Sequence, residues 1–432
     1  MRAAPAMSLK QRVLDKLGFT KKTLIRFIVI ALGSQFIYSI NAIRVVLYDP
    51  FRESMGISNT QMGFLFSLLG LVGLFAYIPA TWFTDRFSSR KILTAGLILV
   101  GLSSFYFATA PAYPVLLLIF FVWGFFQDGP FWASVLKSVR CTASEEKQAT
   151  AFGVLELIRG SIEFFTNTVA IVVFAWMGES LLGMKVAMSV NAGFIITSGI
   201  LCWLILPEDK FLQGETQKEK NREAWEGVKK ALLIPEAWLT GLTACGIYTV
   251  YVGILWFAPF LTKVYSLPVS VAAVFVLFNT SLTRMIASPL GGMLADNMFG
   301  SAVNFMRYVL AGVVTLLTIV IILPKSDALL YIGMGVMILI TISVYMLRGV
   351  YFAPIGEMHT PKAISGATMS VAAVVGYSPG FWMNTINGKL LDSYEPEQAY
   401  IYIFCIMLVG ALVGFICAIV MNKRIRKLKV QH

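Results

Sequence analysis

The sequence predicts an all-α membrane protein of twelve transmembrane helices, arranged as two six-helix bundles. Three observations support this fold class. The 432 residues are 57% hydrophobic and only 13% charged, whereas ordinary soluble domains have about 25% charged residues. Apolar stretches of about 20 residues, long enough to cross a hydrocarbon core of about 30 Å, recur along the chain. A long charged segment near the middle divides these stretches into two groups.

The apolar stretches are predicted to be spans joined by short loops. They form an N-terminal bundle over residues 24–206 and a C-terminal bundle over residues 237–421. The predicted organisation also has an N-terminal cytoplasmic segment over 1–23, a cytoplasmic linker over 207–236 and a basic tail over 422–432. The predicted spans are 24–48, 60–84, 91–109, 113–136, 149–178, 185–206, 237–262, 269–294, 303–323, 328–354, 364–387 and 399–421.

The distribution of positive charge predicts the orientation in the membrane. The chain carries 35 Lys and Arg and a net charge of +12, and most of the basic residues lie at the two ends and in loops that follow even-numbered spans. Basic loops stay on the cytoplasmic side, so both termini are predicted to be cytoplasmic and the protein is expected in the cytoplasmic (inner) membrane. Lipid head groups account for this charge, so nucleic acid is not expected as a partner.

No pattern typical of an enzyme is present in the sequence. The five cysteines show no paired spacing, and the two histidines, His359 and His432, form no catalytic or metal-ligating constellation. No phosphate-binding loop of the GxxxxGK[ST] type occurs, so ATP-driven pumping is unsupported. The sequence therefore predicts no catalytic residue, no metal and no cofactor.

Charged side chains within the spans are the first candidates for function, because an ionisable group deep in the bilayer is costly unless it faces protein or water. The basic ones are Arg44, Arg159, Arg284 and Arg348, and the acidic ones are Asp128, Glu156 and Glu163. Arg44, Arg284 and Arg348 have no acid nearby in the sequence, and surplus guanidinium groups favour an anionic organic substrate. The alternative is that each arginine pairs structurally with an acid or a helix C-terminus.

The intramembrane acids are candidates for ion coupling. Glu156, Arg159 and Glu163 share one helix face, and Glu156 can reach Arg159. This is either a structural cluster or a carboxylate whose proton or cation occupancy depends on the arginine, as ion-coupled transport requires. Asp128 precedes Pro130, which interrupts the backbone hydrogen bonds of the helix. Asp128 is therefore either a coupling residue or a residue that satisfies the backbone groups left unpaired at this break.

Aromatic and amide side chains extend the predicted substrate-binding surface. Tyr38 and Asn41 lie in the first span with Arg44, and a second polar stripe contains Tyr248 and Tyr251. Tyrosines at the membrane interface are the alternative interpretation of this stripe. The full set of predicted substrate-binding residues is Tyr38, Asn41, Arg44, Arg159, Tyr248, Tyr251, Asn279, Arg284, Arg348 and Tyr377.

A short motif follows the second predicted span and recurs, weaker, after the eighth. The first copy contains Asp85, Arg86, Arg90 and Lys91, with Thr81 and Ser88 at glycine positions; the second contains Gly292 and Asp296 without a following arginine. The motif resembles the Gly-x-x-x-Asp-Arg-x-Gly-Arg-Arg signature of the major facilitator superfamily. This resemblance covers essentially the whole chain. It implies alternating access about a central site, with a latch of Asp85, Arg86, Arg90 and Asp296. Alternatively, the basic residues of this loop only determine topology.

Three further stretches, 38–44, 127–132 and 361–377, resemble the organophosphate:phosphate antiporter group and its uncharacterised bacterial relatives. That group grips a phosphate with arginines from its first and seventh spans. Arg44 fits the first position, and Tyr251 stands at the second.

Taken with the intramembrane charges, the resemblance predicts a secondary active transporter of a small organic anion. Transport is coupled to a proton or sodium ion or exchanges a counter-anion, and the protein is expected to function as a monomer in the lipid bilayer. Efflux of a drug or metabolite is one alternative. A transport-like membrane sensor is another.

Overall fold

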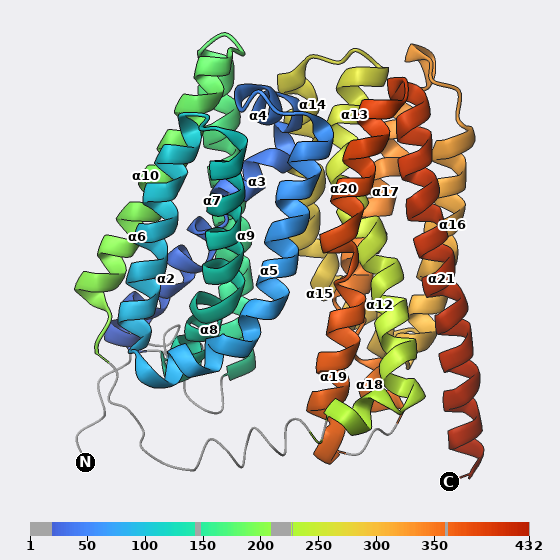
Figure 1. The fold of residues 1–432 in the computed structure, drawn as a ribbon. Coiled ribbons are helices and arrows are strands. Elements are labelled where there is room, and N and C mark those ends of the chain that lie inside the picture. The colour runs from blue at the N-terminus through green and yellow to red at the C-terminus, as the bar shows by residue number, and fades with distance from the viewer. Residues whose placement is uncertain (1–19, 143–147, 209–225, 227, 359–361, 432) are drawn as a thin grey trace, which may run out of the picture. The chain divides into compact units, whose positions relative to one another are not determined.

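The structure, a computed structural model, describes residues 20–142, 148–208, 226, 228–358 and 362–431, and these contain helices and no strand (Figure 1). Within them, ten helical segments are long and apolar enough to cross a membrane, or eleven if the bent pair Lys21–Phe36 and Ser39–Val46 is one span. The predicted all-α membrane fold is confirmed, while the count of twelve and the cytoplasmic termini stay predictions. Most of the predicted N-terminal segment and linker, and both histidines, lie outside the described residues.

The chain divides into two compact units. Unit 1 contains Met1–Arg44 and Leu71–Leu212, and unit 2 contains Val45–Gly70 and Gln213–His432. The boundary between Leu212 and Gln213 falls in the predicted linker. Helix α5 (Asn59–Arg86) begins in unit 2 and ends in unit 1.

Short turns join several helices of the N-terminal half within the described residues. Serine side chains cap two of them, because Ser88 Oγ accepts a hydrogen bond from Lys91 N at 3.4 Å and Ser180 Oγ accepts one from Gly183 N at 3.0 Å. Besides α5, these helices are α2 (Lys21–Phe36), α3 (Ser39–Val46), α4 (Tyr48–Ser54), α6 (Ser89–Ala108), α7 (Tyr113–Phe126), α8 (Trp132–Thr142), α9 (Gln148–Trp176) and α10 (Leu181–Ile205).

In the C-terminal half, several spans consist of two helices separated by a short irregular turn. The helices are α12 (Pro235–Gly253), α13 (Phe257–Val264), α14 (Val269–Leu277), α15 (Thr283–Asn297), α16 (Ala302–Ile322), α17 (Leu330–Arg348), α18 (Pro354–Glu357), α19 (Lys362–Gly376), α20 (Pro379–Ser393) and α21 (Pro396–Gln431).

The predicted span 364–387 is not continuous. It is formed by α19 and α20, each of 15 residues, with Tyr377 and Ser378 between them. Pro379 begins α20 and has no N–H with which to continue the preceding helix. Because neither helix alone reaches the length of a span, this segment is not among the ten counted above.

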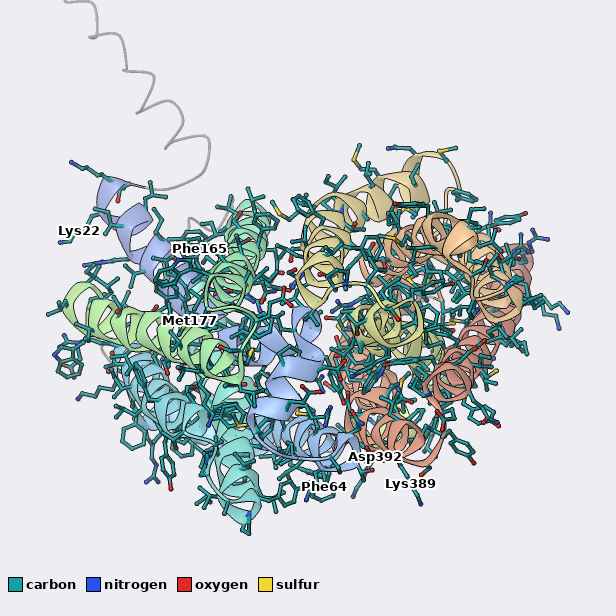
Figure 2. The ribbon with its side chains drawn as sticks, turned by 90° about the horizontal axis from the view of Figure 1, so that it is seen from above. Lys22, Phe64, Phe165, Met177, Lys389 and Asp392 are labelled. Atoms are coloured by element: carbon teal, nitrogen blue, oxygen red, sulfur yellow. The ribbon has the colours of Figure 1, made fainter. Side chains whose placement is uncertain are left out.

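Asp392, near the end of α20, caps the N-terminus of α5 within unit 2 (Figure 2). Its Oδ1 accepts hydrogen bonds from Asn59 N at 3.1 Å and Asn59 Nδ2 at 2.8 Å, and its Oδ2 accepts one from Thr60 N at 2.7 Å. The carboxylate satisfies N–H groups that have no partner inside the helix and meets the positive end of the helix dipole. Partial burial raises the pKa of Asp392, but these hydrogen bonds lower it by more, so that the pKa lies below its ordinary value.

The pH dependence of stability should reveal this cap. Because the pKa of Asp392 is lower in the folded than in the unfolded chain, the carboxylate stabilises the fold above the unfolded value of about 3.9. That contribution is lost as the pH falls through the lower folded value. We therefore expect the melting temperature of the wild type to fall more steeply from about pH 5 to about pH 3 than that of Asp392→Asn. Equal slopes would contradict the cap, and Glu179→Gln, in an exposed loop, should keep the wild-type slope.

Candidate functional site

A break between α7 and α8 positions the acid of the fourth predicted span. Residues Gln127–Phe131 form a single π-helical turn in which Gly129 has non-helical dihedral angles, φ −95° and ψ −109°. Pro130 contributes no N–H to this turn. Ala76 on α5 packs close to Gly129. A Cβ added at Gly129 would lie only 2.7 Å from the Ala76 Cβ, so no larger residue fits there. Such π-turns often occur at functional sites, and here the turn carries Gln127 and Asp128.

Tyr38 and Asn41 contact this break from the α2–α3 region of unit 1. Tyr38 lies at the 52° bend between α2 and α3. Its hydroxyl is 2.9 Å from the carbonyl oxygen of Gln127 and 3.0 Å from Asp128 Oδ1. Asn41 Nδ2 donates to Gln127 Oε1 at 2.9 Å, and Gln127 Nε2 donates to the Ile37 carbonyl at 2.9 Å. The structure therefore joins Tyr38 directly to the predicted coupling residue Asp128, and Asn41 to its neighbour Gln127.

Arg159 on α9 lies at the centre of a second polar network in unit 1. Its NH1 group pairs with Glu156 Oε1 at 2.6 Å, and its Nε donates to Gln35 Oε1 at 3.2 Å. Gln35 Nε2 in turn donates to Glu163 Oε2 at 3.2 Å. The ring of Trp132 covers the guanidinium, with its centroid 4.6 Å from Cζ. The predicted pairing of Glu156 with Arg159 is confirmed, and Glu163 joins the network through the Gln35 amide.

Tyrosine side chains surround Arg348 in unit 2. Arg348 is in the last turn of α17, where the helix dipole favours a cation. Its Cζ lies 3.8 Å from the centroid of the Tyr251 ring, 5.8 Å from that of Tyr248 and 6.0 Å from that of Tyr345. Within the described part of the chain, Nε has no hydrogen-bond partner and no carboxylate pairs with this guanidinium. The faces of the aromatic rings stabilise the positive charge of the guanidinium in the absence of a described paired acid.

The tyrosine cluster continues from Arg348 to the turn between α19 and α20 and to the turn after α17. The Tyr248 ring centroid is 5.1 Å from those of both Tyr251 and Tyr377. The hydroxyls of Tyr377 and Tyr351 are 2.8 Å apart. Tyr377 is 37% exposed and Arg348 is half-buried. Because a charged side chain is costly against lipid, this exposed surface is suited to a watery path.

Three further predicted binding residues lie on α3, on α15 and in the π turn before α15. Asn279 is buried in the π turn Phe278–Leu282, and its Nδ2 donates to Thr341 Oγ1 of α17 at 2.9 Å, a contact that fits a packing role. Arg284 is half-buried at the start of α15. Arg44 is half-buried in the last turn of α3.

Among the predicted latch residues, Arg90 has the clearest partner. Its guanidinium Cζ lies 4.1 Å from the ring centroid of Trp203 on α10, within unit 1. Arg86 is exposed at the end of α5, and Asp296 is exposed near the end of α15. The side chain of Asp85 lies outside what the structure describes. The latch stays a prediction.

An apolar cavity in unit 2 adds no polar binding site, and the described residues contain no metal cluster. An apolar cavity of about 440 Å³ between α12, α20 and α21 contains none of the predicted site residues. Binding sites combine apolar walls with a few placed polar groups, which this cavity lacks. No group of three or more His, Cys, Asp or Glu among the described residues is placed to hold a metal ion.

Apolar helices long enough to span a membrane, with polar and charged networks inside them, are typical of membrane transport proteins. The sequence profile of the Major Facilitator Superfamily matches residues 27–383, and the chain belongs to this family of multi-pass membrane proteins. The family and the transport class predicted from the sequence are thereby confirmed.

Individual proteins resemble the chain over most of its length. "Inner membrane protein YihN" of Escherichia coli strain K12 is 28% identical, over 95% of this chain and 98% of that protein. The "Probable nitrate/nitrite antiporter NarK1" of Thermus thermophilus is 23% identical over 67% of this chain and 64% of that protein. The structure of a bacterial homologue of the human lysosomal transporter Spinster superposes with a TM-score of 0.74 at 15% identity, covering 94% of this chain and 99% of that one. This last similarity shows the fold alone.

Proposed function

We propose that the protein is a secondary active transporter that moves a small organic anion across the inner membrane, with Arg348 binding the anionic group. The environment of Arg348 carries this proposal. Its charge is stabilised by tyrosine rings and a helix C-terminus, and no described carboxylate neutralises it. A guanidinium in this situation can pair with a carboxylate or phosphate through two parallel hydrogen bonds.

The position of Tyr251 supports the same proposal. In the organophosphate:phosphate antiporter group, which the sequence resembles, an arginine is expected at this place in the seventh span. Here Tyr251 contacts the guanidinium of Arg348, which comes from α17. The positive charge beside position 251 thus comes from α17 and not from α12. We infer an anionic substrate whose binding geometry differs from that of the group, and the relative named as a nitrate/nitrite antiporter is consistent with anionic cargo.

Unit 1 supplies the proposed coupling chemistry. Asp128, Glu156 and Glu163 are its intramembrane acids, and Arg159 is held between two of them through direct and amide-mediated contacts. We propose that Tyr38, Asn41, Arg44 and Arg159 from this unit and Tyr248, Arg284 and Tyr377 from unit 2 contribute to substrate binding. The loop residues Asp85, Arg86, Arg90 and Asp296 are proposed to act as a latch during alternating access.

Parallel binding and uptake measurements test this function. A thermal-shift screen of the purified protein against carboxylates, sugar acids, phosphate esters and inorganic anions should identify a stabilising organic anion. The same anion should then be taken up saturably by liposomes that contain the protein. Binding without uptake would support a sensor, and preferential stabilisation by neutral or cationic amphiphiles would support efflux of another class of solute.

A further inference from the structure

We propose that Asp128 is the proton-binding site of this transporter, and that Tyr38 and the Gln127 carbonyl form the cradle for its protonated carboxyl group. The inference rests on the proposed transport function and names a proton as its coupling ion. It assigns to Asp128 a role distinct from that of Glu156 and Glu163, whose contacts involve Arg159 and Gln35.

The number of hydrogen atoms available to the hydrogen bonds around Tyr38 supports the proposal. The Tyr38 hydroxyl lies within hydrogen-bond distance of two acceptors, the Gln127 carbonyl at 2.9 Å and Asp128 Oδ1 at 3.0 Å. A phenol has one hydrogen to donate, and an ionised carboxylate and a carbonyl can only accept. Two full hydrogen bonds are possible only if Asp128 supplies the second hydrogen. A protonated Asp128 donates to the Tyr38 oxygen while the Tyr38 hydroxyl donates to Gln127.

The other groups around Asp128 give little support to a persistent negative charge. On α5, Gly73 packs so closely that a Cβ there would lie 2.6 Å from Asp128 Oδ2. On α9, Arg159 attracts the carboxylate electrostatically. Its guanidinium, however, is already bound to Glu156 at 2.6 Å and to Gln35 at 3.2 Å. An acid in a membrane-spanning helix with one shared cation and one hydroxyl is suited to carry a proton.

A proton fits this space better than a metal cation does. Hard cations such as Mg²⁺ and Ca²⁺ gather about six or more oxygen ligands. Around Asp128 the Tyr38 hydroxyl already contacts both neighbouring oxygens directly, and Gly73 closes the side next to Oδ2. A bound sodium ion would have to separate these contacts, whereas a proton completes them.

The cradle also provides a way for the proton to affect the helices. Tyr38 lies at the bend between α2 and α3, and Gln127 lies at the break between α7 and α8. When the proton leaves, the single Tyr38 hydrogen must serve either the carboxylate or the Gln127 carbonyl, so one of the two contacts is weakened. Proton occupancy is thereby linked to the geometry of two helix breaks in unit 1.

Infrared spectroscopy of the full-length protein in liposomes tests proton binding without a transported substrate. The wild type should show the C=O band of a protonated carboxyl group that disappears as the pH is raised, and this band should be absent in Asp128→Asn. In Tyr38→Phe the band should shift, because its hydrogen bond to the phenol oxygen is lost. Glu179→Gln, which removes an exposed loop carboxyl, should leave the band unchanged. A wild-type minus Asp128→Asn spectrum with no such band would overturn the proposal.

A transport measurement separates this inference from the proposed function. With the anion found in the thermal-shift screen, a pH gradient should drive accumulation by the wild type. Asp128→Asn should still exchange the anion across the membrane, but lose accumulation driven by the gradient. Gradient-driven accumulation that survives in Asp128→Asn, or that depends on sodium, would overturn the proton site while leaving anion transport intact. Failure of every anion to bind or enter would instead contradict the proposed function.

Discussion

Replacement of Arg348 by alanine is expected to abolish uptake of the organic anion. Truncating one partner of a desolvated charge pair costs about 2–5 kcal/mol, which corresponds to a loss of affinity of about thirtyfold or more. Tyr251, Tyr248 and Tyr345, whose rings face the guanidinium, carry no positive charge that could compensate for its loss. Anion binding by thermal shift and initial uptake rates in liposomes measure the effect.

Two further variants distinguish charge from packing in this experiment. Arg348→Lys keeps the charge without the planar fork, so part of the uptake should remain. Arg307→Ala is a matched control, because Arg307 also stacks on a tyrosine, with Cζ 4.6 Å from the Tyr308 centroid, but lies on α16 outside the cluster. It should retain wild-type uptake. Wild-type uptake by Arg348→Ala would refute the role of Arg348 in anion binding.

The architecture was largely predictable because the bilayer imposes a simple pattern on the sequence. Long apolar stretches and charges confined to loops predict spans directly, and the helical segments confirm most of them. The segment 364–387 shows the limit of this pattern. Its hydropathy predicts one span, whereas Ser378 and Pro379 divide it into two helices. The glycine and proline residues of this segment permit a bend, but small residues also permit close packing, so the sequence alone does not decide between a bend and a packed, continuous helix.

Contacts in the polar networks were predictable from the sequence only between residues three or four positions apart on the same helix. Glu156 and Arg159 are three residues apart on α9, and their pairing follows from the helix repeat. Tyr345 precedes Arg348 by one turn and could have been found in the same way. The contact of Tyr38 with Asp128 joins residues 90 positions apart, and no local pattern determines such a pair. The cap of α5 by Asp392 was also missed, because its partners are 333 and 332 positions away.

The substitution Gly388→Ala is expected to destabilise the protein, although the same change in an ordinary helix interior is stabilising. Gly388 on α20 packs against the backbone of Asn59 at the start of α5, and an added Cβ would overlap the Asn59 carbonyl oxygen. Gly63 on α5 packs in the same way against the backbone of Asn384. Glycine commonly allows such close contact between membrane helices. Because the obstacle is backbone, we expect a cost of about 1–3 kcal/mol, as for overpacked cores.

Gly312→Ala in α16 is the matched control, since no atom lies within 4 Å of the position that its Cβ would occupy. There the gain of about 0.5–1 kcal/mol that alanine has over glycine in a helix should appear. Melting temperatures of the two variants in the same detergent should therefore move in opposite directions. If both rise, residues 59–63 do not pack on α20 as described; if only Gly388→Ala falls, the close backbone approach that positions Asp392 on α5 is supported. Combining Gly388→Ala with Asp392→Asn should then cost less than the sum of the two single changes, because the first already displaces the helix end that the carboxylate caps.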